Sequence, residues 1–166
     1  MTNAASLANP SPVAYLSRRY HVSASHRLHS DAFSAEQNQA AYGKCNNPHG
    51  HGHNYSIEVT VGGRVDEITG MVCDIGALDA FARTNLLEHF DTMNLNTLEA
   101  FRDQVSTTEN FTILVHRIFE AFPGAKLTRV RIEETSNNSF EYPAEDIFQP
   151  RPDITSSPTS RKANPQ

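Results

Sequence analysis

Hydrophobic and polar residues alternate along three segments of the chain, a pattern typical of strands with one buried face. The first segment contains neither glycine nor proline, and the second is rich in β-branched residues. Thr69-Gly70 and Asn137-Asn138 are turn signals, and each is followed by a short segment that can return as a partner strand. The expected strands are Tyr15–Leu28, His53–Val61 with its partner Met71–Asp74, and Leu127–Glu133 with its partner Ser139–Tyr142.

Three other segments have the end signals or the apolar spacing of helices. Ser34 and Gln37 have capping-box spacing, and Gly43 supplies a C-terminal stop. Apolar residues recur at helical spacing in two longer segments, the second of which follows Ser106 and Glu109, again at capping-box spacing. The expected helices are Ser34–Tyr42, Ala77–Phe90 and Phe111–Phe122.

These elements predict an α+β fold, with a four-stranded antiparallel sheet of two β-hairpins and two main helices on one face. The 166 residues suffice for one domain, which we expect over residues 14–149. Residues 1–13 and 150–166 are rich in Ser, Pro and other residues that bury little apolar surface, so both are expected to be disordered tails.

The amino-acid composition limits which kinds of molecule the chain is expected to bind. The net charge is −5, which provides no basic surface for nucleic acid or for an anionic membrane, and no stretch approaches the roughly 20 apolar residues of a membrane span. Two cysteines are too few for a disulfide framework, and eight histidines are more than packing requires. We therefore expect a cytoplasmic protein with metal chemistry and a small-molecule substrate. A cleaved organelle-targeting leader is the alternative, because no acidic residue precedes Asp31.

A run of histidines and glycines is the strongest chemical signal. His49, His51 and His53 alternate with Gly50 and Gly52, so all three imidazoles can lie on one side of an extended strand. A zinc ion in an enzyme usually takes three protein ligands and keeps one position open, so a further histidine is needed if only two of these bind. His26 is the leading candidate for that ligand. The spacing alone does not choose among the three histidines of the run.

Cys45 is the candidate reactive group beside the run. It lies in the polar sequence Lys44-Cys45-Asn46-Asn47-Pro48, where packing does not explain a cysteine. A neighbouring lysine and a bound metal ion both favour a thiolate, which can remove a proton from carbon. Cys73 lies in an apolar segment and is interpreted as a small buried hydrophobic residue.

Six segments occur in order between about Leu16 and Tyr142: Ser23-Ala24-Ser25-His26-Arg27-Leu28, Gly43-Lys44-Cys45-Asn46-Asn47-Pro48, Gly50-His51-Gly52-His53-Asn54-Tyr55, Thr69-Gly70-Met71-Val72, Ser106-Thr107-Thr108-Glu109-Asn110 and Glu134-Thr135. Together they resemble the 6-pyruvoyltetrahydropterin synthase family. The Ser-Thr-Thr-Glu-Asn and Cys-Asn-Asn-Pro forms are more similar to the animal-type synthase than to the related 6-carboxytetrahydropterin synthase, which typically has Pro-Thr-Ser-Glu-Asn.

The resemblance implies a tunnelling-fold (T-fold) subunit that assembles as a homohexamer, a dimer of trimers with active sites at subunit interfaces. It implies a lyase that converts 7,8-dihydroneopterin triphosphate to 6-pyruvoyltetrahydropterin, with elimination of triphosphate, in tetrahydrobiopterin biosynthesis. Neither nucleic acid nor membrane is expected as a partner.

The resemblance also implies roles for individual residues. His26, His51 and His53 would bind Zn²⁺, which leaves His49 outside the set. Cys45 would be the catalytic thiol, and Glu134 would anchor the pterin ring through its two carboxylate oxygens. Further substrate contacts would come from Glu109, Thr107 and Thr108, although these residues also fit a helix-capping role.

The chain departs from the family at one catalytic position. Family members carry a Leu-Asp-His segment whose Asp and His form a relay with the cysteine, and the matching residues here are Phe90-Asp91-Thr92. Asp91 is retained, but the Thr92 hydroxyl does not exchange protons near neutral pH as an imidazole does. One interpretation is a slower synthase, and a second is that His89 substitutes. A third is a different outcome: a 6-carboxytetrahydropterin synthase-like or pterin side-chain-cleaving enzyme, or a weakly active or non-catalytic pterin-binding paralogue.

Overall fold

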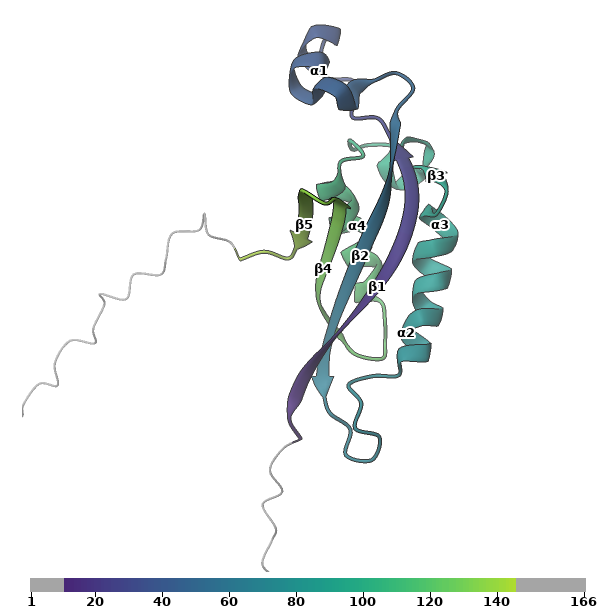
Figure 1. Ribbon diagram of the computed structural model, residues 1–166, viewed down its shortest axis with the longest axis vertical. Coiled ribbons are helices and arrows are strands. Elements are labelled where there is room, and N and C mark those ends of the chain that lie inside the picture. Colours follow the sequence, from purple (N-terminus) through teal and green to yellow (C-terminus); the bar gives the residue numbers. More distant parts are fainter. Residues whose placement is uncertain (1–10, 146–166) are drawn as a thin grey trace, which may run out of the picture.

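The computed structural model describes residues 11–145, which form one sheet covered on one face by helices (Figure 1). The sheet has five strands in the spatial order β3-β1-β2-β4-β5. Neighbouring strands are antiparallel, except that β3 runs parallel to β1. The strands are Val13–His26 (β1), His51–Arg64 (β2), Met93–Asn94 (β3), Lys126–Thr135 (β4) and Asn138–Tyr142 (β5). The predicted α+β class is confirmed, and the two-residue β3 makes the sheet five-stranded and mixed.

The long antiparallel pair β1 and β2 forms the centre of the fold. Its register runs without interruption from Val13 opposite Arg64 to His26 opposite His51. Because successive side chains alternate between faces, one face of this pair is apolar where it meets the helices and the other is polar. The same alternation continues from the core into the histidines at the far end of the pair.

The predicted hairpin between His53–Val61 and Met71–Asp74 is wrong. Strand β2 is bonded to β1 along one edge and to β4 along the other, so it has no edge left for a third partner. The Asp66 carboxylate accepts hydrogen bonds from the backbone of the following turn, including that of Thr69. The Asp74 side chain then caps the next helix. Residues 71–74 therefore lead into a helix, whereas the predicted β4–β5 hairpin is confirmed.

The three predicted helices are confirmed with shifted ends. The Ser34–Gln37 capping box is present at the start of the first helix. The second continues through a π-helical turn, Arg83–Leu87, into a last short piece. The helices are Ala35–Tyr42 (α1), Ile75–Ala82 (α2), Glu88–Phe90 (α3) and Thr108–Glu120 (α4).

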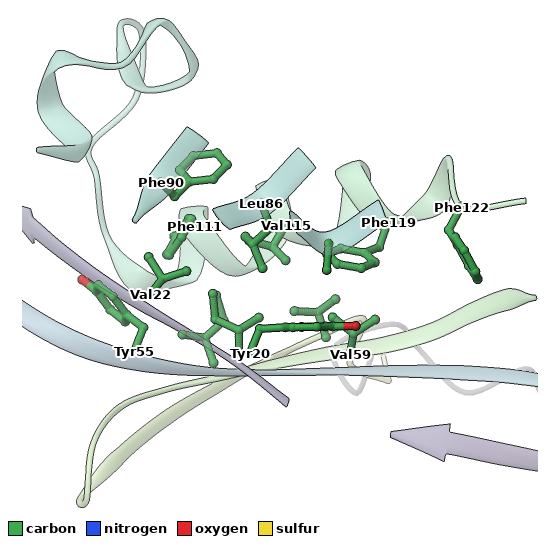
Figure 2. Packing of buried hydrophobic residues seen from close by; sticks show 14 of the residues in the cluster. Tyr20, Val22, Tyr55, Val59, Leu86, Phe90, Phe111, Val115, Phe119 and Phe122 are labelled. Atoms are coloured by element: carbon green, nitrogen blue, oxygen red, sulfur yellow. The ribbon is translucent and has the colours of Figure 1, made fainter. Parts of the chain in front are cut away.

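The core lies between the sheet and the helices α2 and α4 (Figure 2). Phe111, Val115 and Phe119 line the inner side of α4 and meet Tyr20 and Tyr55 of the sheet. Burial of such apolar side chains is the main stabilising contribution to a domain of this size. Figure 2 shows Tyr55 at one end of this row of side chains.

Helix α4 begins one residue later than its capping-box spacing predicts. Thr107 is the N-cap, and its hydroxyl accepts from the backbone N–H of Asn110. Ser106 is fully buried, and its carbonyl oxygen and hydroxyl are both bonded to residues at the end of β1. The contacts of Ser106 with β1 thus take precedence over its capping role.

The described residues contain no helix that is long and apolar enough to cross a membrane. Strand β1 begins at Val13, where the predicted N-terminal tail ends. Residues 1–10, which hold most of that tail, and the predicted C-terminal tail, 150–166, lie outside the described residues.

Candidate metal centre

Three imidazoles converge at one end of the β1–β2 pair. The register places His26 opposite His51 and Ala24 opposite His53, so all three histidines lie on the core face at neighbouring positions. One ligand atom from each histidine lies within 4.8 Å of the others. Among the described residues, these three histidines form a group that could hold a metal ion. The Nε2 atoms of His26 and His51 are 3.1 Å apart.

The turn before β2 determines which histidines of the run take part. Gly50 has a φ of +67°, and a Cβ built there would lie 2.9 Å from the carbonyl oxygen of His26. A glycine is therefore required where the two strands approach each other, and β2 can begin directly at His51. His49 lies before this turn, outside the converging group, and lines a neighbouring cavity instead.

Burial favours the neutral, metal-binding form of His26 and His51, and a hydrogen bond orients His26. The Nδ1–H of His26 donates to the carbonyl oxygen of Ser106 at 2.7 Å, so its Nε2 lone pair is directed at the cluster. Burial lowers the pKa of His26 and of His51, and the neighbouring His53 lowers both further. Neutral imidazoles are ligands for zinc and other divalent metals.

The cluster leaves polar atoms without partners. The Nε2 atom of His53 and the Nδ1 atom of His51 are buried. Neither atom has a hydrogen-bond partner within the described residues. The Nε2 atoms of His26 and His51 are 3.1 Å apart, so their lone pairs repel each other unless a proton or a cation lies between them. A divalent metal would satisfy the Nε2 atoms of His26, His51 and His53 together, so the donor set fits such an ion.

Glu134 of β4 completes the polar end of the sheet. Its Oε1 atom lies 3.8 Å from Nε2 of His26 and 3.7 Å from Nε2 of His53. The Thr108 hydroxyl, at the first turn of α4, donates to the same oxygen at 2.5 Å. Thr107 caps the helix, and Glu109 is exposed on its first turn. Of these predicted substrate contacts, the structure therefore brings Glu134 and Thr108 to the cluster.

Hydrogen bonds hold the turn that contains Cys45 next to the end of β1. Cys45 is half-buried in a 3₁₀ turn, Gly43–Asn46, and its carbonyl oxygen accepts from the backbone N–H of Leu28 at 2.8 Å. The Asn46 amide donates back to the Leu28 carbonyl at 2.7 Å. These bonds place the turn two residues beyond His26. Cys73 is buried, as its apolar surroundings predict.

Asp91 and Thr92 lie on the outer edge of β1, close to its histidine end. An Asp91 carboxylate oxygen accepts from the Ser23 backbone N–H at 2.8 Å, and the Thr92 N–H donates to the Ser23 carbonyl at 2.6 Å. Thr92 has a φ of +62°, which is unfavourable for a β-branched residue. It lines a cavity of about 300 Å³ together with His53.

His89 does not join this group. It lines a different cavity, between α3 and α4, together with Leu114 and Ile118. The structure thus brings Thr92 beside a candidate metal ligand and leaves His89 on the helical layer.

Tyr55 and Ser106 also lie at the candidate site, and the sequence interpretation did not identify them. Tyr55 follows His51 and His53 at the same two-residue spacing, so strand alternation alone places it on their face. Ser106 acts through its backbone carbonyl, which has no signal in the side-chain sequence.

The fold and this cluster define an α+β domain with a candidate metal centre at one end of its sheet. A family model described as 6-pyruvoyl tetrahydropterin synthase matches residues 15–145. Relatives named 6-pyruvoyl tetrahydrobiopterin synthase from Poecilia reticulata and Homo sapiens are each 42% identical to this chain, over 80% of this chain and 92% of their own length.

A solved structure of Caenorhabditis elegans 6-pyruvoyl tetrahydropterin synthase superimposes with a TM-score of 0.77 at 38% identity, and the match covers 81% of this chain and 97% of that chain. The chain therefore belongs to the 6-pyruvoyl tetrahydropterin synthase family and is an enzyme of the lyase class. Its fold is the T-fold of that family.

Proposed function

We propose that this enzyme converts 7,8-dihydroneopterin triphosphate to 6-pyruvoyltetrahydropterin and triphosphate in tetrahydrobiopterin biosynthesis, with Zn²⁺ as its metal. The observation that carries the proposal is the convergence of His26, His51 and His53 beside the Glu134 carboxylate, in a chain 42% identical to named synthases. The reaction rearranges hydrogens within the substrate, so it needs no external oxidant or reductant.

Zinc held by His26, His51 and His53 would supply a Lewis acid that acidifies the C–H bonds next to the substrate's side-chain oxygens. The protein's own part at this position is to present neutral imidazoles. The Ser106 carbonyl fixes the tautomer of His26 by accepting from its Nδ1–H.

Glu134 holds the pterin ring in this proposal. A carboxylate can accept from a ring N–H and from the exocyclic amine at the same time, which fixes the plane of the ring. Thr108 donates to Oε1 of Glu134 and so restricts the rotation of that carboxylate. The ring is thereby held with its side chain beside the three histidines.

Cys45 acts as the base that removes a proton from the substrate side chain. Asp91 is held against β1 by the Ser23 N–H. Thr92 offers a hydroxyl at the position of the relay histidine, and this hydroxyl already donates to the Asp91 carbonyl oxygen at 2.7 Å. We therefore propose a synthase in which proton return to the substrate is slower than with an imidazole.

A pterin-binding protein without turnover is the second candidate, and Thr92 is the observation that favours it. The metal-binding and pterin-binding groups do not depend on that residue. Retention of Cys45 and Asp91 favours the enzyme, because a protein that only binds pterin needs neither.

We further propose that the subunit assembles as a homohexamer with active sites at subunit interfaces. Among the described residues, the outer edge of β1 is bonded to β3 at Ala24 and Ser25 and to Asp91 and Thr92 at Ser23, so the outward backbone groups that precede Ser23 are available to another chain. The two free cysteines support a reducing compartment such as the cytoplasm.

One assay tests the proposal. Purified protein is incubated with 7,8-dihydroneopterin triphosphate and Zn²⁺, and triphosphate release and the pterin product are followed. Release of triphosphate with formation of 6-pyruvoyltetrahydropterin supports the synthase. Binding without either product contradicts it, and a carboxylated pterin with acetaldehyde release indicates the 6-carboxytetrahydropterin reaction instead.

A further inference from the structure

Tyr55 carries a buried hydroxyl that the fold leaves without a partner. The residue is 0% exposed, yet its phenol oxygen has no hydrogen-bond partner at standard distance and angle within the described residues. An unpaired buried hydroxyl destabilises the folded protein, because it loses its hydrogen bonds to water and gains none in return. Tyr20, the other buried core tyrosine, donates to the Asp79 carboxylate at 3.1 Å. A phenylalanine would fill the Tyr55 position without that cost, so packing does not explain the hydroxyl.

The sheet register brings Tyr55 next to Glu134. Strand β2 pairs with β4 so that Ile57 is opposite Ile132 and Ser56 is opposite Glu133. The pairing ends there, and Tyr55 and Glu134 are the next residues of the two strands; both are turned to the buried side, as Ile57 and Ile132 are. Cross-strand neighbours on one face have Cβ atoms about 4.5–5.5 Å apart.

The surroundings of the phenol are those of the active site. Its ring centroid lies 5.4 Å from that of His53 and 6.3 Å from that of His26. Figure 2 shows its oxygen directed away from the other labelled core side chains. Burial raises the pKa of Tyr55, the Glu134 carboxylate raises it further, and hydrogen bonding with the Thr108 side chain lowers it. The phenol thus lies close enough to Glu134 and Thr108 for both side chains to influence it.

The Glu134 carboxylate has room for this donor. Its two oxygens offer about four lone-pair positions. Thr108 occupies one, on Oε1. A bidentate pterin would take two more, one on each oxygen, and one position then remains.

We propose that Tyr55 is a positioning residue whose hydroxyl donates to the Glu134 carboxylate when a pterin is bound, and so holds that carboxylate in the plane of the ring. This inference rests on the proposed function, because it needs a pterin on Glu134. Thr108 and Tyr55 then hold the carboxylate from two directions. The unpaired hydroxyl of the free protein is retained for binding at the expense of stability.

The test compares Tyr55→Phe with Tyr20→Phe, each of which removes one buried phenol oxygen. Affinity is measured with neopterin, a fluorescent pterin without triphosphate, and stability is measured by thermal unfolding of the free protein. Tyr55→Phe is expected to raise the neopterin Kd about 10-fold, the loss of one hydrogen bond to a charged group, and to leave Tm equal or higher. Tyr20→Phe is expected to lower Tm and leave the Kd unchanged, because its hydroxyl is already bonded to Asp79.

A double-mutant cycle shows whether Tyr55 acts through Glu134. In a Glu134→Gln background, Tyr55→Phe should have little further effect on the neopterin Kd. With substrate, Tyr55→Phe should raise KM more than it lowers kcat. A Tyr55→Phe protein with wild-type Kd, or one whose effect persists in the Glu134→Gln background, overturns the inference while the proposed function stands. Failure of the wild-type protein to bind neopterin also overturns the inference, and absence of turnover with 7,8-dihydroneopterin triphosphate overturns the proposed function as well.

Discussion

The approach of the turn at Gly50 to β1 gives a prediction that links the backbone to the metal centre. Gly50 and Gly70 both have left-handed backbone conformations, with φ of +67° and +71°. A Cβ at Gly50 would lie 2.9 Å from the carbonyl oxygen of His26, whereas a Cβ at Gly70 would meet nothing within 4 Å. Alanine at either position therefore introduces the same conformational strain, but only Gly50→Ala pushes the two histidine-bearing strands apart.

The expected magnitudes follow from these two effects. A left-handed non-glycine residue costs about 1–2 kcal/mol, which is the whole effect expected for Gly70→Ala. Contact with a backbone carbonyl that cannot move aside adds a further ~1–3 kcal/mol at Gly50. The displacement also separates His51 from His26, whose Nε2 atoms are 3.1 Å apart. Zinc affinity should therefore fall in Gly50→Ala and stay unchanged in Gly70→Ala.

Urea unfolding of the metal-free proteins measures the unfolding free energy of each variant. Competition with a chromophoric chelator measures the zinc affinities. Gly50→Ala should be the less stable variant and should bind zinc at least about 10-fold more weakly than Gly70→Ala. Equal stabilities together with equal zinc affinities would refute the idea that the approach of Gly50 to β1 builds the site.

Three further predictions concern the site itself. Thr92→His should raise kcat by supplying an imidazole, and an unchanged rate in steady-state turnover would point to another proton donor. Cys45→Ser should lower kcat by about 10²- to 10⁴-fold while zinc content, measured by atomic absorption, is retained; near-normal turnover would exclude the thiol as base. Because burial lowers the pKa of His26 and of His51 below 6.5, the unfolded chain binds more protons in acid. The unfolding free energy of the metal-free protein should therefore fall as pH drops through 6.5, and a pH-independent value in urea titrations would contradict this.

Much of the fold could be predicted from local pattern. The alternation in β1, β2 and β4 and the helical spacing in α2 and α4 report which face of each element is buried, and burial is what these segments share. The capping box of α1 is also local, since Ser34 and Gln37 satisfy each other's backbone. Such signals need no knowledge of the rest of the chain.

The sequence predictions were wrong where contacts with residues distant in the sequence determine the local structure. Met71–Asp74 reads as a strand, but β1 and β4 already occupy both edges of β2. Ser106 has the spacing of a cap, but its carbonyl and hydroxyl are bonded to the end of β1, and Thr107 caps the helix instead. Long-range pairing competes with local preference in both cases.

Part of the candidate site could likewise be predicted from local spacing, and the rest depends on how distant strands pair. Spacing identifies a histidine run but leaves His49, His51 and His53 equivalent, and the convergence of two of them with His26 depends on the β1–β2 register. The place of Glu134 depends on a third strand, β4. Tyr55 carries a periodic signal in the sequence, but its unpaired hydroxyl is visible only when the core is assembled.

The most direct test of the account combines zinc content with turnover in two histidine variants. Wild-type protein should hold about one equivalent of zinc and release triphosphate from 7,8-dihydroneopterin triphosphate. His53→Ala should lose both zinc and turnover, and His49→Ala should retain both, because His49 lies outside the converging group. Undiminished turnover by zinc-free protein, or loss of zinc in His49→Ala with retention in His53→Ala, would contradict the account.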